Sequence, residues 1–203
     1  MNIALIGASG NVGSRILEEA LRRGHKVIAI ARDAGKIAAR DNITARSADV
    51  KDTASLAAAI QGADVVVSSG RFANFTAADV LPALKQAGVK RLAVVGGAGS
   101  LEIAPGKALI DTPEFPAEYK PEASAGRVFL NDLRAEKEIE WTFLSPSALF
   151  IAGERTGKFR LGTDQLLAAA DGKSWISYED YAIALLDELE QPKHVRARFT
   201  VGY

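Results

Sequence analysis

Residues 1–24 read MNIALIGASGNVGSRILEEALRRG, and this stretch decides which fold class the rest of the chain must satisfy. Residues 2–7 form a short, continuous apolar run, which is typical of a strand covered on both faces. The segment after the glycines carries apolar side chains at helical spacing, and Gly24 ends the predicted helix. A strand, a glycine-rich turn and a helix, in this order, predict the opening unit of a parallel α/β sheet.

The turn carries Gly7, Gly10 and Gly13 at the spacing G-x-x-G-x-x-G, which differs from the commoner G-x-G-x-x-G. Both spacings permit a tight turn, close approach of a pyrophosphate to the backbone, and close packing of the helix on the strand. The N–H groups and the dipole at a helix N-terminus favour an anion there. A purely structural turn is the alternative, but its place after the first strand of an alternating series favours a dinucleotide.

Strands and helices continue to alternate along the chain. Further strands are predicted at residues 25–32, 43–50, 63–70, 90–97 and 140–146. This pattern predicts a Rossmann-type, doubly wound α/β fold with parallel strands in the order 3-2-1-4-5-6 and right-handed crossovers. Residues 1–203 are expected to form a single domain, whose part from about residue 147 is a small C-terminal addition that caps the substrate side. A small hairpin region is expected at 158–176, followed by a helix and a last strand.

The sequence also predicts where helices begin and which of their faces are buried. Capping signals are Asp52 or Thr53 for one helix, Thr76 with Asp79 for the next, and Ser177 with Asp180 for the last. The helix at 124–137 is predicted to turn Val128, Phe129 and Leu133 inward. The preceding residues, 98–123, hold four of the seven prolines and are predicted to form a long functional loop.

Composition excludes several classes of function. The chain contains 25 Lys and Arg against 25 Asp and Glu, so it lacks the basic excess that nucleic-acid binding requires. The absence of cysteine excludes thiolate chemistry, and with only two histidines, His25 and His194, a multi-histidine metal site is not expected. No apolar run approaches the ~20 residues of a membrane span. We expect a cytoplasmic protein with a small-molecule partner and no nucleic-acid, membrane or metal ligand; the oligomeric state stays open.

The end of the second strand bears on the choice of dinucleotide. In this fold an acidic residue there binds the ribose 2′-OH of NAD, whereas an arginine accepts the 2′-phosphate of NADP. Arg32 stands at this position, and Arg15 lies close enough to the glycines to join it. Asp33 follows Arg32 directly, and both arginines could simply be solvated. We therefore expect NADP and leave NAD open.

The ordered set of motifs resembles a known family. The motifs are GASGNVG at 7–13, IARD at 30–33, ADVKD at 48–52, VVSSG at 66–70, RLAVVGGAGSL at 91–101, WTFLSPSALF at 141–150 and ISYEDYAIALLDELE at 176–190. Together they resemble the atypical short-chain dehydrogenase/reductases of the NmrA-like, NAD(P)H-binding kind, which include NADH-flavin reductase-like proteins. The resemblance covers nearly the whole chain and implies an NAD(P)H-dependent oxidoreductase.

The resemblance also implies which residues hold the cofactor. Beside the three glycines, it assigns Ser9, Asn11 and Val12 to the pyrophosphate, Asp49 and Val50 to the adenine, Ser68, Ser69 and Gly70 to the ribose, and Gly96 and Gly97 to the nicotinamide ribose. Asp49 could instead cap the turn before the next helix, and each serine could instead bond to loop backbone. Their place at the carboxyl ends of successive strands favours ligand binding.

The Tyr-Lys acid pair of the larger superfamily is absent, because Tyr119, Tyr178 and Tyr181 have no lysine four residues on. Where related proteins often have a lysine, this chain has Arg127, which can bind ribose hydroxyls or a substrate anion but cannot act as an acid or base. The sequence does not identify the catalytic residues, and the candidates are Ser100, Tyr119 and Arg127. A flavin or quinone can take its proton from water, so this site suits FMN, another flavin or a similar flat acceptor. A non-catalytic NADP(H) sensor is the alternative, and a sugar-nucleotide epimerase or dehydratase is less favoured.

The acceptor is expected to bind under the 98–123 loop and beside residues 145–150. The substrate-side candidates are Phe115, Tyr119, Ser145, Ser147, Phe150 and Trp175. The aromatic members could stack on a flat ring, or they could simply pack the loop and the C-terminal part.

Overall fold

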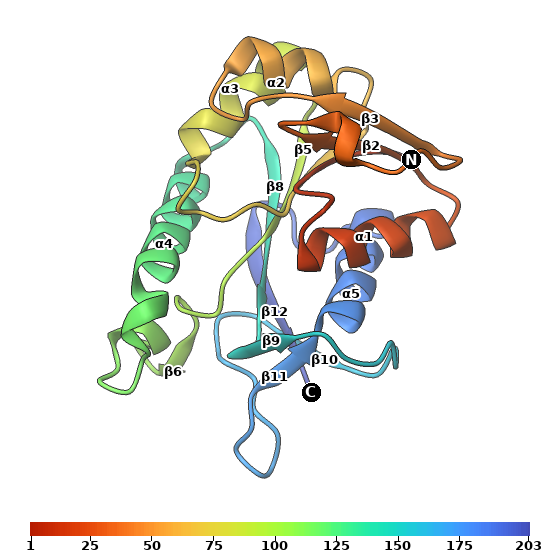
Figure 1. Cartoon of the computed structure of the whole chain (residues 1–203). Helices are drawn as coiled ribbons and strands as arrows, with labels where there is room; N and C mark the ends of the chain where they lie inside the picture. The colour runs from red at the N-terminus through yellow and green to blue at the C-terminus, as the bar shows by residue number, and fades with distance from the viewer.

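The computed structural model describes residues 1–203, apart from the side chain of Lys36. In the described chain, eight strands form one sheet in the order β10-β12-β8-β5-β4-β1-β2-β3 (Figure 1). Their bounds are β1 Asn2–Ile6, β2 Lys26–Ala31, β3 Ile43–Ser47, β4 Val65–Ser68, β5 Arg91–Val95, β8 Glu140–Pro146, β10 Arg160–Gly162 and β12 Ala197–Gly202. All neighbouring pairs are parallel except β10 with β12. The predicted order is confirmed, with β8 as the sixth strand.

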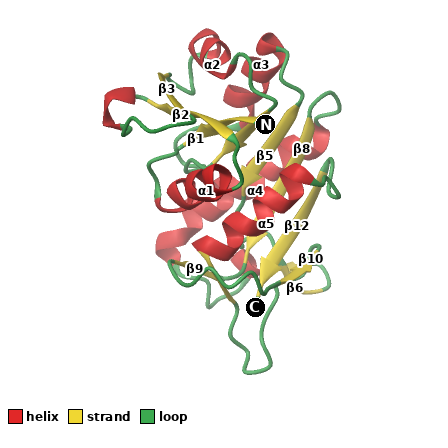
Figure 2. Cartoon of the chain, turned by 90° about the vertical axis from the view of Figure 1, so that its right-hand side faces the viewer, coloured by secondary structure: helices red, strands yellow, loops and turns green.

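Helices cover both faces of this sheet, which makes the fold doubly wound as predicted. The helices are α1 Asn11–Arg22, α2 Thr53–Ile60, α3 Ala77–Ala87, α4 Lys120–Ala135 and α5 Tyr178–Glu190. On β1, Ile3 and Leu5 pack with α1 and α5, whereas Ala4 and Ile6 pack with α2, α3 and α4. Figure 2 shows α1 and α5 together on one side of the sheet. This alternation explains why the strands read as continuous apolar runs.

The predicted helix caps are confirmed. The Asp52 carboxylate accepts from the Ser55 N–H at 3.1 Å, and Thr76 forms a capping box with Asp79. Ser177 Oγ accepts from the Asp180 N–H at 3.0 Å. α4 begins at Lys120, before its predicted start, and its Val128 is exposed, contrary to the inward position expected of it.

The segment after residue 147 differs in part from the expected cap. α5 and β12 belong to the main layers, since α5 packs on α1 and β12 pairs with β8. The hairpin expected at 158–176 is wrong: β10 joins β12, and β11 (Trp175–Ser177) pairs in parallel with β9 (Leu149–Ile151). In the described structure, β9 and nearby loop residues are the parts of this segment that reach the substrate side. The loop region at 98–119, between β5 and α4, contains β6 Glu102–Ala104, β7 Lys107–Ala108 and the short helices η2 Leu109–Asp111 and η3 Ala117–Tyr119. A further short helix, η1 Ala34–Lys36, follows β2.

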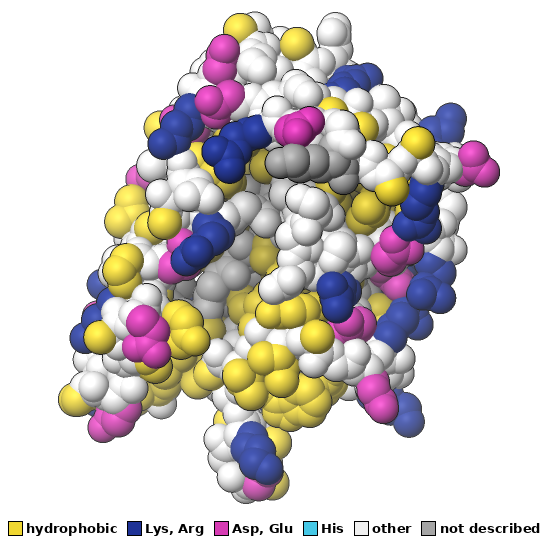
Figure 3. Space-filling model, viewed as in Figure 1, with side chains coloured by type: hydrophobic (Ala, Val, Ile, Leu, Met, Phe, Trp, Pro, Cys, Tyr) yellow, Lys and Arg dark blue, Asp and Glu magenta, His cyan; other side chains and the backbone are white. Residues whose placement is uncertain are grey.

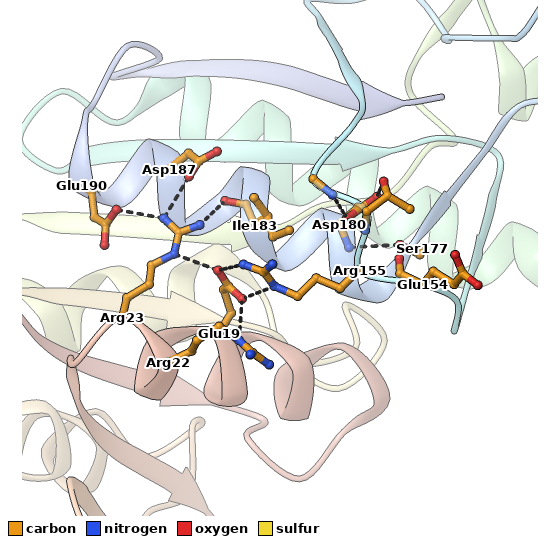
Figure 4. Close-up of polar contacts among 12 residues, drawn as sticks. Glu19, Arg22, Arg23, Glu154, Arg155, Ser177, Asp180, Ile183, Asp187 and Glu190 are labelled. Atoms are coloured by element: carbon orange, nitrogen blue, oxygen red, sulfur yellow. Dashed lines mark hydrogen bonds and ion pairs between the residues drawn. The ribbon is translucent and has the colours of Figure 1, made fainter.

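A charged network ties the C-terminal half to α1 (Figure 4). The carboxylate of Glu19, only 3% exposed, accepts from Arg155 at 2.8 and 2.9 Å and from Arg23 at 2.8 Å. Arg23 also bonds to Asp187 and Glu190 of α5, at 2.8 Å each. The Arg155 guanidinium, with Arg23, holds the pKa of Glu19 below its usual value despite burial. The network fixes α1, whose N-terminus faces the candidate site, against α5.

Among the helices that the structure describes, none has the length and apolar character needed to cross a membrane.

Candidate functional site

The glycines shape the turn between β1 and α1. Gly7 has a φ of +82°, and a Cβ there would lie 2.6 Å from the Ser69 carbonyl oxygen. A Cβ at Gly13 would lie 2.0 Å from the Gly7 carbonyl oxygen, so this glycine lets the helix approach the strand. Both positions exclude any other residue unless the backbone moves.

The N-terminus of α1 fits an anion. Its cap is Gly10, whose missing side chain leaves the N–H groups of the first turn without a side-chain acceptor. The first turn carries no acidic residue that would repel a phosphate. In the described hydrogen bonds, Ser14 is the first residue of α1 whose N–H meets a helix-type acceptor, the Gly10 carbonyl at 2.9 Å. The N–H groups of Asn11, Val12 and Gly13 precede it and can bind a pyrophosphate.

A cavity of about 480 Å³ lies beside this turn, and we call it the dinucleotide cavity. It collects residues that follow β1, β2, β3 and β4. Its walls are Ile6, Gly7, Ser9, Ile30, Ala31, Arg32, Ala48, Asp49, Val50, Lys51, Gly70, Ala73, Asn74 and Phe75. Six of the expected cofactor residues meet here: Gly7, Ser9, Arg32, Asp49, Val50 and Gly70. This is the edge of a parallel sheet at which ligands bind.

The charged residues of this cavity have distinct positions. Arg32 is exposed at the end of β2, and Lys51 is a second cation in the wall. The Asp33 carboxylate accepts from the Gly35 N–H at 3.1 Å and so caps η1. The Asp49 carboxylate accepts from the Lys51 N–H at 3.0 Å, which is the turn-capping alternative. A contact between the other carboxylate oxygen of Asp49 and the adenine stays a prediction.

The remaining cofactor candidates lie outside this cavity. Arg15 donates to Glu179 of α5 at 3.0 Å, and its guanidinium lies 5.9 Å from the centre of the Tyr178 ring. Arg15 does not line the dinucleotide cavity as Arg32 does, and its expected phosphate contact stays a prediction. Ser68 is buried in β4, and the Ser69 N–H bonds to the Ile6 carbonyl at 2.9 Å.

A second cavity, of about 750 Å³, opens next to the first between α4, the 96–119 segment and β9; we call it the acceptor cavity. Figure 3 shows this face hollowed, with hydrophobic side chains gathered at the lower edge of the hollow. Its walls include the expected residues Gly96, Gly97, Ser100, Phe115, Tyr119, Arg127, Ser147 and Phe150. Two expected residues do not line it. Ser145 is fully buried in β8, and the Trp175 ring packs on Tyr203 with ring centres 4.4 Å apart.

The surface of the acceptor cavity is mostly apolar, but its wall also carries polar side chains. Ser100 Oγ accepts from Arg198 at 3.3 Å, and Arg198, 8% exposed, also bonds to Asp164 at 2.8 Å. A hydroxyl that accepts one hydrogen bond keeps its own proton to donate, and Ser100 lines the cavity. Arg127 is paired with Asp111 at 2.9 and 3.0 Å.

Two tyrosines lie in different surroundings near this cavity, and a catalytic role for Tyr119 stays a prediction. The Tyr181 hydroxyl is buried and donates to the Leu144 carbonyl at 2.6 Å, and burial raises its pKa further from neutrality. Tyr119 borders the acceptor cavity but is 61% exposed at the start of α4. Among the described residues, no group of three or more His, Asp or Glu side chains could hold a metal ion.

Sequence reasoning missed some residues of the site. Lys51 follows Asp49 and Val50 in the ADVKD motif, so its place in the cavity could have been read from the motif. Phe72, Glu122 and Arg198 carry no such signal, because each acts across elements distant in the chain.

Comparison with known proteins agrees with this geometry. Residues 7–192 match the family model described as NAD(P)H-binding. A solved structure from Burkholderia pseudomallei, described as a candidate exported protein, is 46% identical, with 100% of both chains covered and a TM-score of 0.91. A candidate epimerase from Bacteroides thetaiotaomicron is 45% identical, covering 100% of this chain and 96% of that one, with a TM-score of 0.94. A candidate NADH-flavin reductase from Streptococcus pneumoniae TIGR4 is 36% identical, covering 100% and 99%, with a TM-score of 0.87.

The family match spans the glycine turn, both cavities and α5, and it agrees with the resemblance that the motifs carry. The chain therefore belongs to the NAD(P)H-binding family, in its NmrA-like, atypical short-chain dehydrogenase/reductase branch.

Proposed function

We propose that this protein is an NAD(P)H-dependent oxidoreductase that prefers NADPH and passes hydride to a flavin or a comparable flat acceptor. One observation carries the proposal: two neighbouring cavities share an edge of the sheet, one beside an uncapped helix N-terminus and the other largely apolar. The first suits the dinucleotide and the second suits a planar acceptor. The candidate NADH-flavin reductase among the relatives supports the same reaction class.

In this proposal the N–H groups of Asn11, Val12 and Gly13 bind the pyrophosphate, and Gly96 and Gly97 lie under the nicotinamide end. The bound dinucleotide supplies the hydride. Arg32 and Lys51 place positive charge where a 2′-phosphate would lie, which supports a preference for NADPH.

The acceptor cavity suits a flat ring that needs no protein acid. Phe72, Phe115 and Phe150 contribute aromatic surface, and Ser100 offers a hydrogen-bond donor for an acceptor nitrogen or oxygen. The proton that completes the reduction comes from water. An epimerase, the class suggested for one relative, receives less support because Tyr119 is exposed and has Ala123 four residues on.

A non-catalytic NADP(H) sensor is the second candidate, because the missing Tyr-Lys pair is compatible with it as well as with a flavin-type reductase. Turnover separates the two candidates. We expect NADPH to be oxidised in the presence of FMN, riboflavin or members of a quinone panel, with NADH less effective. Tight NADPH binding without turnover of any acceptor would favour the sensor, and no binding of either dinucleotide would refute both.

We also propose a cytoplasmic location without nucleic-acid or membrane partners. The equal numbers of acidic and basic residues support the absence of a nucleic-acid partner. Because one relative is described as a candidate exported protein, cell fractionation is the test, and recovery outside the cytoplasm would contradict the proposal.

A further inference from the structure

The two cavities share a wall, the loop at residues 71–75 that follows β4. Ala73, Asn74 and Phe75 line the dinucleotide cavity, while Phe72 lines the acceptor cavity. A displacement of this short loop therefore changes the shape of both cavities.

One carboxylate fixes the loop. Glu122, in the first turn of α4, accepts from the Phe72 N–H at 2.7 Å with one oxygen and from the Ala73 N–H at 3.0 Å with the other. Arg71 Nε lies 3.8 Å from the second oxygen. Hydrogen bonds from backbone N–H groups to a carboxylate are stronger than bonds between neutral groups. Glu122 itself borders the acceptor cavity.

Packing joins the same loop to the body of α4. A Cβ at Gly126 would lie 2.9 Å from the Phe72 ring, so the loop rests directly on the helix. The Phe72 ring also lies 5.2 Å from the Phe129 ring and 5.9 Å from the Phe143 ring, measured between centres. Packing of the Phe72 side chain therefore anchors the loop on α4. The two hydrogen bonds to Glu122 fix the backbone at Phe72 and Ala73, where the chain turns toward the dinucleotide cavity.

We propose that Glu122 is a positioning residue that couples the acceptor cavity to the dinucleotide cavity through the 71–75 loop. It touches no reacting atom. It preorganises the wall against which the dinucleotide binds, and its own place in the acceptor cavity makes that wall sensitive to the second ligand. The inference rests on the proposed binding of a dinucleotide in the first cavity, but it does not require that any acceptor is reduced.

The test compares the variants Glu122→Gln and Glu122→Ala with wild type in binding of NADP⁺ and NAD⁺. The glutamine keeps one acceptor oxygen but turns an NH₂ group toward the other N–H, so it should hold the loop incompletely. If the loop is then competent in about a tenth of molecules, the dissociation constants rise about tenfold for both dinucleotides. In Glu122→Ala, the dissociation constants should rise by at least the same factor. Glu118→Gln is the matched control, since Glu118 is an exposed carboxylate one turn away that borders neither cavity.

Hydrogen exchange supplies a readout that a general loss of stability would not produce. The Phe72 and Ala73 amides should exchange faster in Glu122→Gln while the amides of β4 keep their protection and the melting temperature stays within a few degrees of wild type. The inference is overturned if Glu122→Gln binds both dinucleotides as tightly as wild type. If wild type binds neither dinucleotide, both the proposed function and this inference are refuted. If wild type binds but reduces no acceptor, the oxidoreductase proposal alone fails.

Discussion

The replacement Arg32→Ala tests how the protein selects its dinucleotide. Arg32 is exposed at the end of β2 and lines the dinucleotide cavity. At 4 Å in a solvent-like dielectric, a unit charge gains about 1 kcal/mol from one opposite charge, and a 2′-phosphate carries about two. The loss of Arg32 should therefore weaken NADP⁺ binding by about 2 kcal/mol, or about thirtyfold. NAD⁺ lacks the phosphate, so its affinity should change little.

The assay is a fluorescence titration of NADPH and NADH at physiological and at high salt. The difference between the two dinucleotides should shrink in wild type as salt rises, because the Arg32 contact is exposed and therefore screened. Lys51→Ala should give a smaller loss of the same kind, because Lys51 is a point charge without the paired donors of arginine. An unchanged ratio of NADPH to NADH affinity in Arg32→Ala, or in the charge reversal Arg32→Glu, would refute the role of Arg32.

Three further predictions concern the acceptor, the turn and the α1–α5 network. Ser100→Ala should slow the reduction of a flavin or quinone about tenfold, because one hydrogen bond to the acceptor is lost. Reduction of N-methylacridinium should not change, since that acceptor has no atom that can receive the bond, and equal losses of rate for both acceptors would contradict the donor role. Gly13→Ala should destabilise the fold by about 3 kcal/mol in urea unfolding, because its Cβ would meet the Gly7 carbonyl at 2.0 Å; an unchanged midpoint would contradict the tight packing. Glu19→Gln should lower the free energy of unfolding at pH 7 by about 2 kcal/mol, less than a fully buried pair would lose because Arg155 is 42% exposed. Because folding lowers the pKa of Glu19 from 4.5, the wild-type advantage should be complete above that pH and fade as the pH falls through the folded value; an advantage that persists in acid would argue against it.

The features that could be predicted from the sequence are those set by neighbouring residues. The glycine turn, the capping pairs such as Thr76 with Asp79, and the order of the six predicted parallel strands all depend on short-range patterns and on general rules of chain connection. For the same reason the two cavities lie where the carboxyl ends of the strands were expected to place them.

The features that could not be predicted from the sequence depend on partners far away in the chain. The ion-pair partner of Arg15, Glu179, lies 164 residues on, and nothing near Arg15 in the sequence signals it. The apolar pattern near residue 160 suits a strand, yet a pattern does not name the pairing partner, which is β12 rather than β11. Glu122 reads as an ordinary charged residue of a helix start, because its two N–H donors lie about 50 residues earlier.

The most direct test of the account is a crystal structure of the protein with NADP⁺. The pyrophosphate should lie against the N–H groups of Asn11 and Val12, with the 2′-phosphate beside Arg32 and the nicotinamide over Gly96 and Gly97. A dinucleotide bound elsewhere, or crystals soaked to saturation whose glycine crevice holds only water, would contradict it.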